Sequence, residues 1–407
     1  MADKINILWI SLCSPYESVD HAGGQTLNYY VSRFEKDDNF KIRLVTFCAA
    51  NEVDKLLHTN RTCIIDEIVL PEGIKRLVGN ALSINSKFNP WYKYGNGLPW
   101  KLAWMMLRKL RQIKREGYVP DVVIMEWTEI TLYINRIKEL FPTSYYMACQ
   151  HDVTYMRKKI EANDENCQIR RVYKQIGAEN VKKLEINALN RCDIVWVQNR
   201  NDKRVLKKDG VREDKLSFLV PYYHRSQMEY VRKNNNIIFW GNMRRRPNIV
   251  AARWFADEVM PLLKDSDCKF YILGAEGDET LKDIASDRII PVGFIDEVDI
   301  WFAESLCFVA PMSLGAGIKV KCLEAMYSGI PVLTNKRGID GIPAKDGIDF
   351  IKCETSEDYV RAIVELMEGD VHITGKSIVD KNFNMDKSFE KYRNKLLSFC
   401  HKGNKIG

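Results

Sequence analysis

The feature that most constrains the fold is a repeated alternation between short, nearly continuous apolar segments and segments with helical spacing. Such apolar segments are typical of strands that are buried on both faces of a sheet. In the first half, the expected strands are Ile5–Ser11, Lys41–Cys48, Val122–Trp127, Ser144–Gln150 and Asp193–Asn199, and the expected helices include Gln25–Lys36 and Lys101–Glu116. Strands that alternate with helices predict right-handed crossovers and a mostly parallel sheet.

The alternation starts again in the second half and predicts a second unit of the same kind. Its expected strands are Ile237–Gly241, Lys269–Gly274, Ile289–Phe294, Cys307–Met312 and Pro331–Asn335, and its expected helices are Asn248–Leu263, Val320–Tyr327 and Glu357–Met367. The charged, turn-rich segment Asp202–Gln227 marks the boundary. We therefore expect an α/β fold of two Rossmann-like, doubly wound parallel-sheet domains, residues 1–215 and 216–385.

A terminal helical pattern follows the second domain. Within Ser388–Phe399, one face carries Phe389, Tyr392, Leu396 and Phe399. Such a face must pack on a surface, and either domain offers one. Packing of residues 386–407 back onto the N-terminal domain is one of these two arrangements.

Composition excludes several classes of protein. No apolar run approaches the roughly 20 residues that a membrane helix needs, and the N-terminus lacks the pattern of a signal peptide. The 11 cysteines form no C-x-x-C pair, which argues against a zinc ribbon or a redox dithiol. We expect no metal site and a reduced, cytoplasmic location.

The net charge of +7 lies mostly in residues 1–200. It does not form the clustered stripe of a nucleic-acid binder, so we expect no nucleic-acid partner. An excess of Lys and Arg suits an anionic partner such as a phospholipid surface or a lipid diphosphate. The simpler interpretation is a solvated surface of mixed charge.

One helical segment bears on membrane contact. Within Trp91–Arg115, an apolar stripe of Leu102, Met106, Leu110 and Ile113 lies opposite a basic face. This pattern indicates either a helix that buries its stripe against the sheet or one that lies at the inner face of a membrane.

The densest motif runs from Ser313 to Thr334. An expected strand ends before it, Gly315 and Gly317 form a turn, and Lys319 stands where the next helix begins. The free N–H groups and the dipole of a helix N-terminus attract phosphate, and a lysine adds a point charge there. Glu324, in the next turn, has the chemistry to accept both hydroxyls of a ribose. In the alternative interpretation, the glycines only make the turn, Lys319 is solvated and Glu324 is an exposed helical residue.

These residues also carry a family resemblance. The Gly-Ala-Gly-Ile-Lys turn at 315–319, the Leu-Glu-Ala-Met helix at 323–326 and the Gly-Ile-Pro-Val run at 329–332 resemble the C-terminal signature of retaining GT-B glycosyltransferases of family 4. Shorter and less specific motifs occur in the same order as in that family: Gly23-Gly24, Pro120-Asp121-Val122-Val123, His151-Asp152, Asp193-Ile194-Val195, Gly241-Asn242-Met243 and Gly293-Phe294. The resemblance covers most of residues 5–345.

The resemblance implies the GT-B architecture, with two domains that face each other across a cleft. It also implies transfer of a sugar from a nucleotide-diphospho-sugar to an acceptor hydroxyl, with retained configuration and no metal. The implied catalytic residues are His151, Lys319 and Glu324. The implied donor-binding residues are Gly23, Gly24, Arg244, Arg246, Gly293, Phe294, Ile295, Gly315, Ala316, Gly317, Ile318 and Leu323. Among these, Gly24 would approach the diphosphate from a loop, and Phe294 would lie beside the base or belong to the core.

The sequence departs from the family pattern at three positions. The usual first acid of the signature falls at Ala316, the usual Arg after the first strand of domain two at Asn242, and the usual Lys at Pro247. The diphosphate clamp is therefore altered.

We accordingly expect a glycosyltransferase of polysaccharide or glycoconjugate synthesis, with same-face attack and a donor of the UDP type used as substrate. No cofactor is expected, and the acceptor is a carbohydrate, a lipid-linked molecule or a protein. The alternative is a weakly active nucleotide-sugar-binding or scaffold subunit. A nicotinamide dehydrogenase is disfavoured because G-x-G-x-x-G does not follow the first strand.

Overall fold

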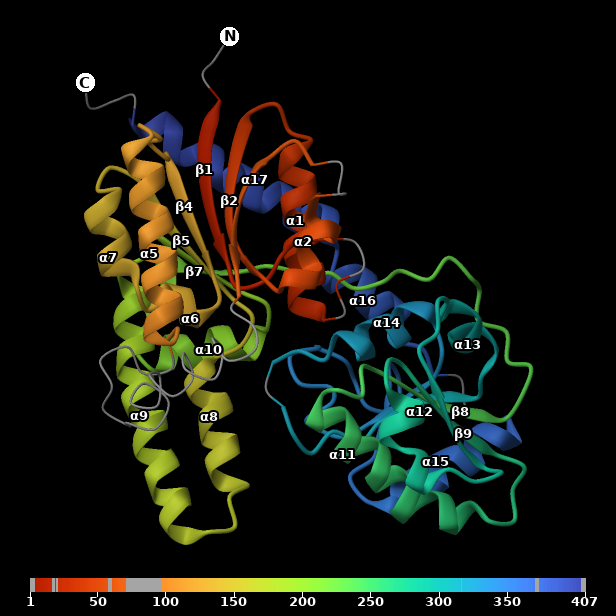
Figure 1. Ribbon diagram of the computed structural model, residues 1–407. Helices are drawn as coiled ribbons and strands as arrows, with labels where there is room; N and C mark the ends of the chain where they lie inside the picture. Colours follow the sequence, from red (N-terminus) through yellow and green to blue (C-terminus); the bar gives the residue numbers. More distant parts are fainter. Residues whose placement is uncertain are drawn as a thin grey trace. The chain divides into compact units, whose positions relative to one another are not determined.

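The computed structural model describes residues 4–16, 19, 21–57, 61–70, 97–315, 317–369 and 373–403. The chain divides into two compact units (Figure 1). Unit 1 comprises Met1–Val220 with Asp386–Gly407, and unit 2 comprises Pro221–Met385. The ten cysteines whose side chains are described are free thiols. Within the described ranges, no helix has both the length and the apolar character needed to cross a membrane.

Unit 1 is built on a sheet whose described strand pairs are all parallel, in the order β3-β2-β1-β4-β5-β6-β7. The strands are β1 (Ile5–Ser11), β2 (Phe40–Cys48), β3 (Ile64–Val69), β4 (Val122–Glu126), β5 (Tyr145–Gln150), β6 (Ile194–Val197) and β7 (Leu216–Phe218). The five expected strands are present. The sequence did not indicate β3 and β7, because β3 alternates between buried and solvent-facing residues and β7 has only three residues.

Helices cover both faces of this sheet. They are α1 (Ala22–Glu35), α2 (Ala50–Leu57), α5 (Trp100–Arg115), α6 (Thr128–Thr131), α7 (Ile134–Leu140), α8 (Thr154–Asn163), α9 (Gln168–Asn190), α10 (Arg200–Lys208) and α17 (Met385–Gly403), with a 3-10 turn at Glu213–Lys215. Successive residues of β1 enter different cores: Leu8 and Ile10 pack in the cluster with α5, α7 and α9, while Ile7 and Trp9 pack in the cluster with α1 and α17. Burial on both faces explains why the strand is continuously apolar.

Unit 2 has a parallel sheet in the order β10-β9-β8-β11-β12-β13. Its strands are β8 (Asn236–Trp240), β9 (Lys269–Leu273), β10 (Ile289–Gly293), β11 (Cys307–Ala310), β12 (Val332–Thr334) and β13 (Ile351–Lys352). Its helices are α11 (Arg246–Trp254), α12 (Gly277–Thr280), α13 (Asp299–Glu304), α14 (Val320–Ser328), α15 (Ser356–Glu368) and α16 (Lys376–Asn382), with a 3-10 turn at Lys282–Ile284.

The helix expected at Asn248–Leu263 is not uniform. It begins two residues earlier as α11, passes into a π-helical turn at Phe255–Val259 and ends as a 3-10 turn at Met260–Leu263. Pro261 has no N–H to donate back along the helix, which accounts for the change in hydrogen bonding at this end.

The strand order reverses at one place in each sheet, between β1 and β4 in unit 1 and between β8 and β11 in unit 2. In open parallel sheets, ligands bind beyond the carboxyl ends of the strands at such a switch point. The segments that follow β1, β4, β8 and β11 are therefore the places to look for a site.

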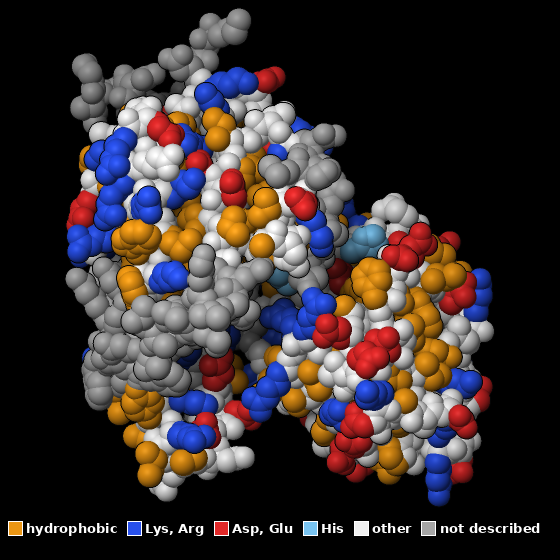
Figure 2. All heavy atoms as spheres, in the orientation of Figure 1, with side chains coloured by type: hydrophobic (Ala, Val, Ile, Leu, Met, Phe, Trp, Pro, Cys, Tyr) orange, Lys and Arg blue, Asp and Glu red, His pale blue; other side chains and the backbone are white. Residues whose placement is uncertain are grey.

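The apolar stripe of α5 belongs to the core. Met106, Leu110 and Ile113 are fully buried in the cluster with α7 and α9, and Leu102 packs against it. The stripe is thus not available to a membrane. Basic side chains gather on the outer side of α5 and α7 in Figure 2.

The C-terminal helix α17 returns to unit 1 and completes its second core (Figure 1). Tyr392 is fully buried, and its ring contacts those of Trp9, Tyr30, Phe34 and Trp196. Residues separated by most of the sequence are therefore joined in one aromatic cluster.

We predict that Tyr392→Ala destabilises unit 1 by about 3–5 kcal/mol, because truncating a buried aromatic side chain leaves a cavity. The measurement is urea unfolding followed by tryptophan fluorescence. Asn394→Ala is the matched control, since Asn394 is exposed on the same helix. Equal unfolding midpoints for the two variants would contradict a structural role for α17 in this core.

Candidate functional site

The turn after β11 has the backbone that its glycines require. Gly315 and Gly317 have φ values of +92° and +73°, in the left-handed region that other residues rarely adopt. The chain then enters α14, with Lys319 at the N-cap and no side-chain cap. Ala316 lies outside the described residues.

Lys319 is buried inside this turn. Its ammonium donates to the carbonyl of Gly317 at 2.6 Å and lies 3.5 Å from the carbonyl of Gly315, which is also 3.5 Å from Nη1 of Arg337. Lys319 is only 8% exposed, so the interpretation of a solvated surface lysine is wrong. Two cations thus face the carbonyls of the glycine turn.

Glu324 is also buried, so the interpretation of an exposed helical residue is wrong. Oε1 accepts the backbone N–H of His224 at 3.2 Å, and Oε2 accepts Nε1–H of Trp240, at the end of β8, at 3.1 Å. Burial raises the pKa of Glu324, whereas these two hydrogen bonds act in the opposite direction. The carboxylate is therefore held in one orientation, with one lone pair on each oxygen still able to accept a hydrogen bond.

Three consecutive arginines lie beyond the end of β8. Arg244 forms an exposed ion pair with Glu276, with 2.7 Å between Nε and Oε1, so its side chain is directed toward the loop after β9. Arg245 is the N-cap of α11 and Arg246 its first residue, and both are exposed. Asn242 accepts the backbone N–H of Arg244 at 2.8 Å through Oδ1. An asparagine thus shapes the turn where the family pattern has an arginine.

One residue of this region was missed by sequence reasoning. Lys321, in the first turn of α14, donates to Oδ1 of Asn248 at 2.7 Å, and its Nζ lies 4.2 Å from the centroid of the Phe239 ring. Burial lowers the pKa of Lys321 to about 7. In the sequence, Lys321 was marked only by its position two residues after Lys319, in a helix whose other residues were expected in the core.

The remaining predicted residues are divided between surface and core. Gly293 ends β10 with φ +81°, and a Cβ there would lie 2.8 Å from the carboxyl group of Asp278. Phe294 is 72% exposed, so the interpretation of a core residue is wrong. Leu323 is fully buried and packs in the interior, while Ile295 and Ile318 are partly buried.

In unit 1, His151 follows β5 with both ring nitrogens bonded. Nδ1 lies 3.0 Å from Nε2 of Gln198, and Nε2 lies 2.8 Å from Oε2 of Glu126. An amide nitrogen is only a donor, so Nδ1 accepts and the proton resides on Nε2, which donates to Glu126. The two contacts hold the His151 ring in one orientation between Gln198 and Glu126.

Glu126 and Trp127, at the end of β4, also escaped the sequence prediction. Glu126 is buried and accepts Nε1–H of Trp9 at 3.1 Å, besides the bond from His151. Trp127 stacks on the His151 ring, with centroids 4.3 Å apart, and has an unusual positive φ of +69°. Glu126 lies within the apolar strand expected at Val122–Trp127, so the sequence pattern did not mark it as a site residue.

The two glycines after β1 lie in the first turn of α1 rather than in a loop. Gly24 is buried, and its N–H donates to Nδ1 of His21 at 3.0 Å, so this amide already has a partner. A Cβ on Gly23 would lie 3.1 Å from Cζ2 of Trp127 and 3.3 Å from Nδ1 of His151. Gly23 thus leaves room for the stacked pair, and the structure brings Gly23 and His151 together.

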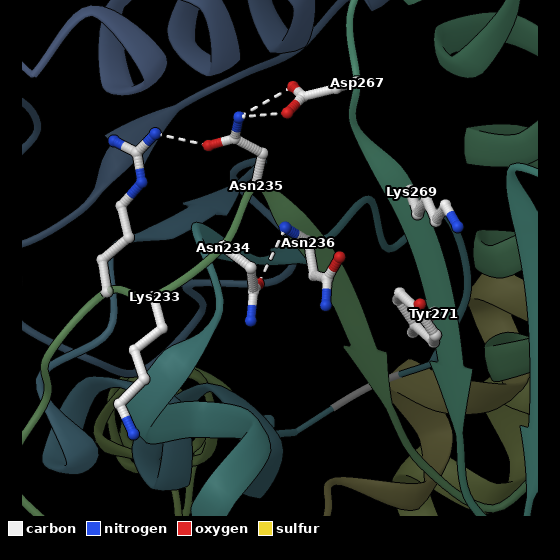
Figure 3. A pocket seen from close by; sticks show the side chains of 8 residues that line it. Lys233, Asn234, Asn235, Asn236, Asp267, Lys269 and Tyr271 are labelled. Atoms are coloured by element: carbon white, nitrogen blue, oxygen red, sulfur yellow. Dashed lines mark hydrogen bonds between the residues drawn. The ribbon is translucent and has the colours of Figure 1, made fainter.

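Unit 2 also has a hollow at the other end of its strands, away from the glycine turn. It lies at the amino ends of β8 and β9 and is lined by Asn236, Lys269 and Tyr271, among others (Figure 3). Asn235 donates to both carboxylate oxygens of Asp267 there, at 2.7 and 2.9 Å. Because ligands of such sheets bind at the carboxyl ends, this hollow is not the candidate site. No cluster of metal-ligating side chains occurs in the described part of the chain.

Comparison with known proteins gives one family match and one distant relative. Residues 234–369 match the family model described as glycosyl transferases group 1. A Klebsiella pneumoniae protein described as an uncharacterized 44.6 kDa protein in the cps region is 22% identical over 325 residues, 75% of this chain and 80% of that protein.

Two solved structures are similar in fold. HepE of Anabaena, in complex with UDP and glucose, has a TM-score of 0.64 at 11% identity, over 97% of this chain and 100% of that chain. Sucrose-phosphate synthase from Thermosynechococcus elongatus has a TM-score of 0.68 at 14% identity, again over 97% and 100%. The two Rossmann-like units therefore form the GT-B architecture. The family match is confined to residues 234–369, and the similarity to the solved structures is one of fold.

We predict that Gly23→Ala lowers turnover by about tenfold, because the new methyl group displaces the Trp127–His151 pair. Thermal stability should stay near that of the wild type, since alanine favours the helix. Gly177→Ala, within α9, is the control for helix propensity. Unchanged turnover in Gly23→Ala would show that the stacked pair has no part in the reaction.

Proposed function

We propose that this protein is a retaining glycosyltransferase that moves a sugar from a UDP-type donor to an acceptor hydroxyl. The observation that carries the proposal is the glycine turn after β11, which leads into α14 with Lys319 and Glu324 buried at its start. This turn lies at the switch point of unit 2 and within the matched glycosyl transferases group 1 segment. The presence of UDP and glucose in the similar HepE structure supports the donor class.

In this proposal the donor's diphosphate binds at the N-terminus of α14. The helix start has no side-chain cap, so its amides suit phosphate oxygens. Glu324 accepts the ribose hydroxyls with its remaining lone pairs. The exposed ring of Phe294 offers a stacking surface for the base.

We assign His151 the task of holding a hydroxyl of the transferred sugar. As a neutral imidazole it brings no charge that needs compensation. Its Nδ1 becomes an acceptor for that hydroxyl when the bond from Gln198 is exchanged, while Glu126 keeps the Nε2 proton in place.

The proposed reaction is a same-face substitution without a metal. The diphosphate leaves, and the incoming hydroxyl is hydrogen-bonded to it as the new bond forms. Catalysis then rests on positioning and on stabilising the charge of the leaving diphosphate by Lys319, a nearby arginine and helix N-termini.

The alternative function is a nucleotide-sugar-binding or scaffold subunit. It is favoured by Asn242 and Pro247, which carry no charge at the positions of the family's clamp, and by the internal bonds of Glu324. A turnover assay with a panel of nucleotide sugars separates the two functions. Binding without transfer or donor hydrolysis would support the alternative.

We further propose that the acceptor is a carbohydrate, a lipid-linked molecule or a protein in polysaccharide or glycoconjugate synthesis. The similarity to the Klebsiella pneumoniae protein in the cps region supports a shared setting.

We predict that Glu324→Ala and Lys319→Ala each lower donor affinity or turnover at least tenfold, about 1.4 kcal/mol. The measurements are UDP binding by calorimetry and donor consumption. Glu365→Ala and Lys269→Ala, both exposed in unit 2, are the matched controls. Wild-type kinetics in both site variants would show that the donor binds elsewhere.

Peripheral membrane contact is proposed through α5, where Trp100 and Trp104 are exposed at 44% and 50% beside basic residues. We predict that the wild-type protein floats with vesicles containing anionic phospholipid and that Trp104→Ser reduces the bound fraction severalfold. Vesicles of neutral lipid are the control. Equal flotation of the two proteins would exclude α5 as the contact.

A further inference from the structure

The carboxyl end of β8 holds a cation that the proposed mechanism does not yet use. Lys321 comes from the first turn of α14, yet its amine meets residues from two other elements: Phe239 of β8 and Asn248 of α11. A Cβ on Gly241 would lie 2.6 Å from Nζ and 2.8 Å from Nδ2 of Asn248, so a side chain at position 241 would displace the amine and the amide from their observed positions. The amine therefore sits where the strand order of unit 2 reverses.

The partners of Lys321 hold it without neutralising it. Nδ2 of Asn248 donates to the carbonyl of Asn242 at 2.7 Å, which fixes the amide so that Oδ1 faces Lys321. Among the described residues, no carboxylate forms an ion pair with this lysine. An amide oxygen and the face of an aromatic ring satisfy an amine but leave its positive charge uncompensated.

The charged surroundings favour an anion. Arg245, at the N-cap of α11, and Lys319 act on Lys321 as positive charges, and Glu324 acts as a negative one. The Cys322 thiol has its pKa raised to about 12 by burial and is neutral near pH 7. His224 reaches this group only through Glu324, to which it donates its backbone N–H. Among the described residues named here, Arg245 and Lys319 are the cations and Glu324 is the carboxylate that act on Lys321, and two helix N-termini without side-chain caps begin nearby.

We propose that Lys321 is a phosphate-binding residue of the donor site, which donates a hydrogen bond to the diphosphate and supplies the charge that Asn242 and Pro247 lack. The inference rests on the proposed function. Lys321 keeps some solvent exposure as a residue, although its amine is surrounded by protein.

Binding of the diphosphate is coupled to protonation of Lys321 in this arrangement. With a pKa of about 7, Lys321 is largely neutral at pH 8 in the free protein. An adjacent dianion favours the ammonium form, so binding takes up on the order of one proton from solvent at pH 8. The dissociation constant then rises by up to about tenfold for each pH unit above 7.

The test is calorimetric titration with UDP at pH 8.0 in two buffers of different ionisation enthalpy. UDP is the probe because its terminal phosphate, with a pKa of about 6, is already ionised at this pH. We expect proton uptake by the wild type, UDP binding without uptake by Lys321→Arg, and at least tenfold weaker binding by Lys321→Met. Lys269→Met, at the amino end of β9, is the control and should match the wild type.

The outcomes are distinguishable. If the wild type and both Lys321 variants bind UDP with equal affinity and proton count, this inference is overturned while the proposed function stands. If the wild type binds no UDP, the proposed function is overturned and the inference with it. Lys321→Arg keeps the test decisive if Lys321→Met does not fold.

The pH dependence of stability, measured without ligand, tests whether the amine of Lys321 is neutral in the free protein. The pKa of Lys321 lies below the roughly 10.4 of an unfolded chain, so the unfolded state binds more protons between these values. The stability of the wild type relative to Lys321→Met must therefore rise with pH from about 7 toward 10. Parallel stability curves would show that the free amine is charged near pH 8 and would overturn the predicted proton uptake, while the affinity of Lys321→Met decides the phosphate contact.

Discussion

Parallel pairing of the strands is the constraint on which the rest of the structure depends. Because the strands of each sheet run the same way, their carboxyl ends meet at one edge, and the reversal of strand order opens that edge at one place. The residues with unusual chemistry occupy these places. Glu126 ends β4 and His151 follows β5, while Gly241 and the glycine turn follow β8 and β11. The helices and the aromatic core around Tyr392 hold the sheets that create these edges.

The two edges differ in electrostatic character. In unit 1, Glu126 and His151 form a chain of hydrogen bonds with Trp9 and Gln198. Such a network fixes side-chain positions and offers polar groups to a neutral ligand. In unit 2, the described cations Arg245 and Lys319 act on Lys321 together with the carboxylate of Glu324, and α11 and α14 begin without side-chain caps. The proposed function accordingly assigns the anionic diphosphate to unit 2 and the hydroxyl groups of the sugar to unit 1.

Sequence patterns predicted the part of this organisation that depends on period and composition. Strands buried on both faces were predictable because their runs are continuously apolar, whereas β3 was not, because its residues alternate. The glycine turn was predictable because Gly315 and Gly317 need positive φ. Glu126 and Lys321 were not, since a carboxylate in an apolar strand and a lysine in a core helix acquire their meaning only from neighbours distant in sequence. Gly24 was assigned to a loop because nothing in its pattern shows that His21 caps α1.

In the proposal, Lys321 supplies the positive charge that Asn242 and Pro247 lack. Asn242, before α11, and Pro247, its second residue, carry no charge, yet Asn248 presents its amide oxygen to a lysine from the neighbouring helix. The positive charge therefore comes from α14 and not from the segment after β8, but it lies at the same switch point. A positive charge in the first turn of a helix is opposed by the helix dipole, so the charged amine is unfavourable there until an anion arrives. The same placement that favours the neutral amine in the free protein thus gives a bound diphosphate a partner whose charge develops only on binding.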